Sequence, residues 1–157
     1  MKKVVLSPGE FFFGAGDEEI RTLLGSCIAI TLWHPQRRLG GMCHFLLPSA
    51  GKPPGRTLDG RYADQAMALF LAALKRTRTA PREFQVKVFG GGNMFPDTLM
   101  QSPIGERNIE AAHSLLSGHG FPAPESHVGC SGHRTVILDL ATGHTWLRWK
   151  KGNNLLL

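Results

Sequence analysis

The chain has 157 residues, of which 42% are apolar and 19% charged, and its formal net charge is +6. This balance is typical of one globular domain with a single sizeable core, here residues 1–157, and it excludes a disordered chain. No apolar run reaches the roughly 18 residues that span a bilayer, and no apolar segment follows the N-terminal lysines as in a signal peptide. We therefore expect a cytoplasmic protein that does not insert into membranes.

The positive charge is spread along the chain, with small clusters at 75–78 and 148–151. Nucleic-acid binding usually shows a basic run interleaved with aromatic residues or a recognisable module, and the sequence has neither. We therefore expect no nucleic-acid partner. A solvated basic face and attraction to an acidic protein surface both stay open.

Hydrophobic periodicity predicts elements in the order strands, helix, strand, helix, strands. Apolar and β-branched runs predict the strands, and apolar residues at helical spacing predict the helices. The strands are expected at 2–6, 10–13, 19–24, 27–34, 40–47, 84–89, 134–140 and 144–150, and the helices at 62–78 and 103–117. This order indicates an α/β (α+β) domain, in which two main helices pack with mixed, largely antiparallel sheets in a layered sandwich.

The ends of the two helices carry recognisable signals. Asp59 lies upstream of the first helix as a candidate cap. Ser102 is the expected N-cap of the second, with Pro103 at its first position and Gly118 closing it. The proline- and glycine-rich stretch 48–60 is the longest expected loop, and such loops are often functional.

Three cysteines, Cys27, Cys43 and Cys130, are an odd number at scattered positions. This argues against a disulfide framework and leaves three interpretations for each: core residue, metal ligand or nucleophile.

The apolar runs 27–34 and 40–47 predict a hairpin whose turn centres near Pro35 and Gln36. In that register the numbers of opposed residues sum to 71, so Cys27 lies opposite His44 and Cys43 points to the other face. A slip of one residue would destroy this pairing, whereas a slip of two would leave a diagonal neighbour.

A thiol beside an imidazole is a chemically useful pair. The imidazolium form stabilises a thiolate, and the same ring can protonate departing ammonia and later activate water. Gly25 and Ser26 could form a tight turn whose backbone N–H groups face an oxyanion. Geometry alone leaves a purely structural, buried pair open.

Several segments, in this order along the chain, resemble the signature of the CheD family of chemoreceptor glutamine deamidases. They are 24–30, 40–48, 62–66, 87–95, 104–108 and 134–136. The resemblance implies a fold like that of the deamidating bacterial toxins, and a cysteine-dependent hydrolase that converts glutamines of methyl-accepting chemotaxis receptors to glutamates. It implies Cys27 as nucleophile, His44 as base and Thr22 as the third catalytic residue, with no cofactor or metal.

The family also implies a CheC-type phosphatase as a partner, so a non-catalytic regulator that binds receptors and this phosphatase is the alternative function. We expect a monomer. Two positions depart from the family pattern: the segment 127–130 stands where an Asp-x-Gly-Gly segment is usual, and Cys43 precedes the catalytic histidine.

Other motifs admit both functional and structural interpretations. His127, Cys130 and His133 could bind a metal, although their spacing and the intervening glycines favour a turn. The glycines 90–92 lack a phosphate-binding pattern and favour a tight turn near the site. Asn93 and Ser26 could hold a carboxamide or serve structure alone.

Overall fold

The computed structural model describes residues 1–94 and 103–151. The predicted elements are present, and two short ones are added to them. The elements are β1 (Lys2–Leu6), β2 (Phe11–Ala15), β3 (Glu18–Leu24), β4 (Ile28–His34), β5 (Leu39–Phe45), α1 (Ala63–Thr77), the 3-10 turn η1 (Pro81–Glu83), β6 (Gln85–Gly90), α2 (Ile104–Gly118), β7 (Glu125–Val128), β8 (His133–Asp139) and β9 (Thr145–Lys150).

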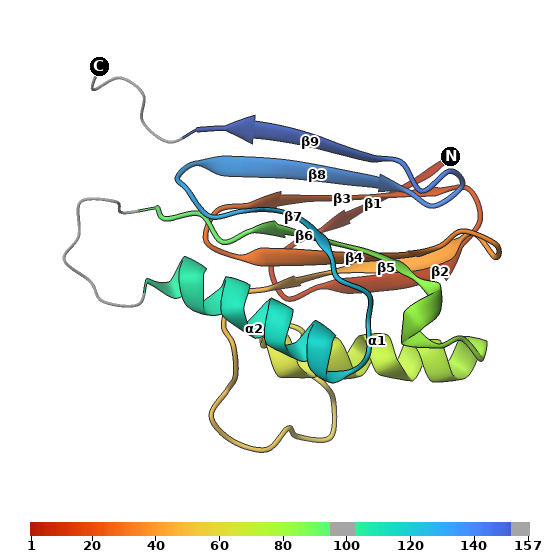
Figure 1. The fold of residues 1–157 in the computed structure, drawn as a ribbon, viewed down its shortest axis with the longest axis horizontal. Helices are drawn as coiled ribbons and strands as arrows, with labels where there is room; N and C mark the ends of the chain where they lie inside the picture. Colours follow the sequence, from red (N-terminus) through yellow and green to blue (C-terminus); the bar gives the residue numbers. More distant parts are fainter. Residues whose placement is uncertain (95–102, 152–157) are drawn as a thin grey trace.

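The strands form two sheets, and the two helices lie along the outer side of one of them (Figure 1). The first sheet has the order β1-β3-β8-β9 and the second β2-β5-β4-β6-β7. Among the strand pairs of the described ranges, β1–β3 and β6–β7 are parallel and the others are antiparallel. The predicted class, mixed and largely antiparallel sheets with two helices in a layered sandwich, is confirmed.

Each interface between layers has its own core. One apolar cluster fills the space between the two sheets, and a larger one lies between the second sheet and the helices. Strand β4 contributes to both, with Ala29 in the first and Ile28 and Ile30 in the second. This double burial explains why its sequence is almost continuously apolar.

The register predicted for the β4–β5 hairpin is wrong by two residues. His34 pairs with Leu39 and Ala29 pairs with His44, so the numbers of opposed residues sum to 73 and not 71. The turn holds four residues, with Arg38 in the left-handed region at φ 48°. Because the shift is even, every side chain keeps its predicted face, and Cys27 becomes a diagonal neighbour of His44.

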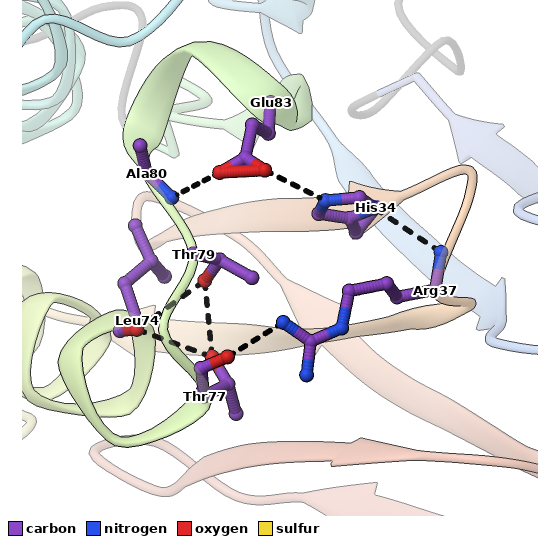
Figure 2. Close-up of polar contacts among 7 residues, drawn as sticks. All are labelled: His34, Arg37, Leu74, Thr77, Thr79, Ala80 and Glu83. Carbon is purple, nitrogen blue, oxygen red and sulfur yellow. Dashed lines mark hydrogen bonds and ion pairs between the residues drawn. The ribbon is translucent and has the colours of Figure 1, made fainter.

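Figure 2 shows what holds this turn in place. The buried His34 ring accepts from the Arg37 backbone N–H at 3.2 Å and contacts the Glu83 carboxylate through Nε2 at 3.3 Å. The Arg37 guanidinium donates to the carbonyl of Thr77, the last residue of α1, at 2.6 Å. The turn is thus bound to α1 and η1. These contacts join residues 40 or more positions apart, so the local sequence does not reveal them.

Two helix-end predictions need correction. The Asp59 side chain does not cap α1, since it binds Arg61, and it is the Asp59 backbone N–H that donates to Gln65. Helix α2 begins at Ile104, one residue after Pro103, and Gly118 is its last residue. The predicted cap Ser102 and the end of the 87–95 motif, Phe95, lie outside the described residues.

Strand β7 and the turn η1 were not predicted. Strand β7 is short and polar, and it is defined by its parallel pairing with β6, in which Phe89 lies opposite His127. Of the helices in the described ranges, none is long and apolar enough to cross a membrane.

Replacing His34 by alanine should lower the free energy of unfolding by about 2 kcal/mol, because two hydrogen bonds and the edge contact with Phe84 are lost. Urea unfolding followed by circular dichroism measures it. The exposed Lys75→Ala in the last turn of α1 is the control and should change stability by less than about 0.5 kcal/mol. Equal effects from the two variants would contradict the anchoring role of His34.

Candidate active site

A buried histidine and a buried threonine meet between the two sheets. His44 lies on β5 and is 1% exposed. Thr22 lies on β3 and is also 1% exposed, because side chains alternate along this strand and Thr22 shares the buried face with Ile20 and Leu24. Thr22 Oγ1 lies 2.7 Å from His44 Nδ1. The contact joins strands of different sheets, so stacking of the layers fixes the direction of the imidazole.

The hydrogen bonds of Thr22 determine the tautomer of the ring. Its hydroxyl donates its one hydrogen to the carbonyl of Leu6 at 2.9 Å. The hydroxyl can therefore only accept from His44, and Nδ1 must carry the proton of the neutral ring. The lone pair is then on Nε2. This nitrogen is buried and has no hydrogen-bond partner among the residues that the structure describes.

Cys27 lies one residue before β4, on the face that bears Ala29, the partner of His44. The thiol packs against the inter-sheet cluster, the side on which the imidazole lies. A diagonal pair of this kind has its α-carbons roughly 7–8 Å apart, within reach of the two side chains. Cys27 is partly exposed, so its side chain is accessible from solvent.

The turn that carries Cys27 is held by its carbonyl groups. The Gly25 carbonyl accepts from the Gly92 N–H at 3.0 Å, and the Cys27 carbonyl accepts from the Gly91 N–H at 2.8 Å. Between them, the Ser26 carbonyl accepts from the Asn108 side chain at 3.1 Å. The N–H groups of Ser26 and Cys27 donate to no backbone carbonyl in residues 1–94 and 103–151.

The predicted substrate-side residues all lie around this turn. Met94 packs over Gly25, where an added β-carbon would lie 3.2 Å from its sulfur. Gly25, Ser26 and Asn93 are each partly exposed, and the Asn93 backbone N–H donates to the Cys130 carbonyl at 2.6 Å. The tight turn expected at the glycines is present, since Gly90 and Gly91 have φ values of 109° and 65°.

Sequence reasoning missed two residues that support the site, Asn108 and Arg134. Arg134 is 1% exposed and donates to the His127 ring at 2.9 Å and to the carbonyls of Gly129 and Gly90 at 2.8 and 3.3 Å. Its guanidinium also lies over the Trp149 ring. A charged residue at an inward-facing strand position was the signal in the sequence. Arg134 thus holds the glycine loop, residues 90–92, which binds the carbonyls of the Cys27 turn.

Burial sets the protonation of the catalytic candidates. It lowers the pKa of His44 from 6.5 to about 4 and raises the pKa of Cys27 above its ordinary value. At neutral pH the resting pair is therefore a neutral imidazole and a thiol. Cys43 faces the helix-side core, as predicted, and burial raises the pKa of its thiol to about 12, which makes it unreactive.

The metal site considered for His127, Cys130 and His133 is not formed. Within the described ranges, no three histidine, cysteine or acidic side chains are grouped to hold a metal ion. His127 uses Nδ1 to accept from Arg134. Gly129, Cys130 and Gly132 all have positive φ, the turn that the glycines favoured.

A thiol beside an oriented imidazole is the arrangement of cysteine-dependent acyl-transfer enzymes. The chain belongs to the CheD family, whose model, described as CheD chemotactic sensory transduction, matches residues 46–149. The family resemblance of the sequence is thus confirmed.

Curated relatives extend the match over nearly the whole chain. A probable chemoreceptor glutamine deamidase CheD 3 of Dechloromonas aromatica is 44% identical over 97% of this chain and 90% of its own. Similarly named proteins of Pseudomonas savastanoi pv. phaseolicola and Albidiferax ferrireducens are each 46% identical, over 93% and 91% of this chain and 84% of their own. Among solved structures, the Bacillus licheniformis hypothetical protein YfiH aligns with 72% of this chain and 46% of its own, at 13% identity and a TM-score of 0.43.

The low pKa of His44 predicts a loss of stability in acid. The unfolded chain takes up a proton near pH 6.5, whereas the folded ring stays neutral down to about pH 4. As the pH falls from 6.5 to 4, the folded state should therefore lose as much as about 3 kcal/mol on account of this ring.

Urea unfolding between pH 7 and pH 4 measures this loss, with His44→Gln as the matched control. The variant cannot take up the proton, so its free energy of unfolding should fall less steeply below pH 6.5. Parallel curves for the two proteins would contradict a neutral, buried His44.

Proposed function

We propose that this protein is a chemoreceptor glutamine deamidase that uses Cys27 as nucleophile and His44 as general base and acid. One observation carries the assignment of residues: the Thr22 contact leaves the buried Nε2 of His44 unpartnered on the face that bears Cys27. Glutamine deamidation is the activity in the names of relatives that align over more than 90% of the chain.

The reaction begins from neutral partners. As the Cys27 sulfur attacks the carboxamide carbon of glutamine, the thiol proton passes to His44 Nε2. The carbonyl oxygen becomes an oxyanion. The imidazolium then returns the proton to the leaving nitrogen, and ammonia departs to leave a γ-glutamyl thioester on Cys27.

Hydrolysis of the thioester uses the same ring. Nε2 takes a proton from water, and the resulting hydroxide attacks the thioester carbon. The second tetrahedral intermediate expels the Cys27 thiolate, which recovers its proton from the imidazolium, and glutamate is released. Each half-reaction returns His44 to the neutral state that its buried setting favours.

Oxyanion stabilisation is assigned to the turn before β4. The N–H groups of Ser26 and Cys27 are uncommitted in the described structure, while the carbonyls of residues 25–27 are all bound by other groups. A turn held in this way can present its N–H groups to a developing negative charge without reorganisation. Asn93, on the glycine loop beside the turn, is assigned to the substrate carboxamide.

Thr22 is the orienting member of the triad. With its own hydrogen donated to Leu6, it selects the tautomer in which Nε2 is the base. The neutral hydroxyl adds no charge, in keeping with a ring whose resting form is also neutral.

The setting of the reaction follows from the receptor substrate. We place the protein in the cytoplasm, as a monomer with a single deamidase domain over residues 1–157, acting on methyl-accepting chemotaxis receptors. Binding to a CheC-type phosphatase belongs to the same proposal. Neither a cofactor nor a metal takes part in the steps above.

The chemistry is tested by incubating the protein with a receptor cytoplasmic fragment and measuring glutamine residues by mass spectrometry. Wild type should convert selected glutamines with a mass gain of roughly one dalton and release ammonia, and Cys27→Ser should do neither. Cys43→Ser, which changes the buried thiol on the opposite face of the sheet, is the control and should retain conversion. Conversion by Cys27→Ser, or none by wild type, would overturn the proposal. An undiminished effect of Cys27→Ser on chemotaxis would point to the non-catalytic regulator.

The role of Thr22 predicts a contrast between two substitutions. Thr22→Val keeps the shape but removes the acceptor for Nδ1–H, so the turnover number should fall on the order of 10²-fold. Thr22→Ser keeps the hydroxyl and should retain most activity. Initial rates of ammonia release measure both variants, and equal losses would contradict an orienting hydrogen bond.

A further inference from the structure

Asn108 is a polar side chain buried in an apolar stripe. The buried residues of α2 are Gly105, Asn108, Ala112 and Leu116, which follow one another at helical spacing along a single face. Asn108 is 0% exposed, although asparagine is seldom fully buried. It belongs to the 104–108 motif, to which no role has so far been given.

The amide group of Asn108 joins two remote segments of the site. Its Nδ2 donates to the Ser26 carbonyl at 3.1 Å and to the Leu46 carbonyl at 2.8 Å. Ser26 directly precedes the nucleophile, and Leu46 lies two residues beyond the base. These partners are 82 and 62 residues away along the chain, so α2 bridges the two halves of the catalytic pair.

The orientation of the amide is unambiguous. Both partners are carbonyl oxygens, which only accept, so the NH2 group must face them and the oxygen Oδ1 must face away. Oδ1 is buried and has no partner among the described residues. The residue therefore leaves an acceptor unsatisfied while it makes both donor contacts, a cost that an apolar side chain in this stripe would avoid.

The two Asn108 hydrogen bonds hold segments that lie outside the strands of the sheet. Cys27 and Ser26 lie before the first residue of β4, and Leu46 lies after the last residue of β5. The β4–β5 ladder ends at the Ile28–Phe45 pair, so the Ser26 and Leu46 carbonyls lie just beyond it. The close approach of α2 helps, because a β-carbon at Gly105 would lie 2.5 Å from the Gly91 carbonyl.

We propose that Asn108 is a positioning residue of the active site, which holds the Cys27 turn at a fixed distance from the strand end that carries His44. The expected change in turnover number rests on the proposed function, whereas the expected change in Cys27 thiol reactivity does not. Loss of the amide should let the turn move by a fraction of an ångström to an ångström, which is enough to impair proton transfer between Sγ and Nε2.

Two substitutions of Asn108 distinguish the loss of its amide N–H donors from the loss of its side-chain volume. Asn108→Asp keeps the shape but sets oxygen atoms against both carbonyls, and Asn108→Ala removes the group. The matched control is Leu116→Ala, which opens a cavity in the same face of α2, two turns further on, and touches neither carbonyl. All variants, and the wild-type reference, carry Cys130→Ser, because Cys130 is exposed and would also be alkylated.

The first measurement is the rate of Cys27 alkylation by iodoacetamide as a function of pH, at temperatures where circular dichroism shows each variant folded. Both Asn108 variants should show a shifted pH profile relative to wild type, since the thiol loses its aligned base. Leu116→Ala should keep the wild-type profile despite its lower stability. If Asn108→Ala matches Leu116→Ala, the proposal is overturned, whether or not Asn108→Asp folds.

The second measurement is deamidation of a receptor fragment. The turnover number of Asn108→Ala should fall on the order of 10- to 100-fold with KM little changed, and that of Leu116→Ala should not. A rise in KM alone would overturn the positioning role. If wild type fails to deamidate while the alkylation profiles still differ as expected, the proposed function fails and the positioning of Cys27 by Asn108 stands.

Discussion

The hydrogen bond between Thr22 and His44 is the contact on which the site depends. It crosses from the four-stranded sheet to the five-stranded one, so it exists only when the two layers are stacked in register. Since the Thr22 hydroxyl donates to Leu6, the bond also dictates where the imidazole carries its proton. As a result, the lone pair of the ring is on the buried Nε2, on the side of the sheet where Cys27 lies.

The proposed nucleophile, Cys27, is positioned by different means from the proposed base, His44. His44 is part of a strand with neighbours on both sides, whereas Cys27 lies in a turn ahead of β4. Three successive carbonyls, of Gly25, Ser26 and Cys27, are each bound, two by the glycine loop and one by α2. Holding a turn by its carbonyls leaves its N–H groups available, which is the requirement for binding an oxyanion.

Much of this could be predicted from the sequence. The apolar run of β4 marked a strand buried on both faces, and alternation placed Cys43 away from His44, because side-chain direction in a strand follows period two. The hairpin register was wrong by two residues because the turn is set by His34, Arg37 and their contacts with α1 and η1. Asn108 and the β6–β7 pairing escaped prediction for the same reason: each is defined by partners remote in sequence.

The proposed mechanism requires that the neutral His44 ring carries its proton on Nδ1 and offers Nε2 as the base. The ¹⁵N chemical shifts of its two ring nitrogens at neutral pH report this directly, with His44→Gln used to assign the signals. We expect a protonated Nδ1 and an unprotonated Nε2 in the wild type. A ring protonated on Nε2, or on both nitrogens, would contradict it.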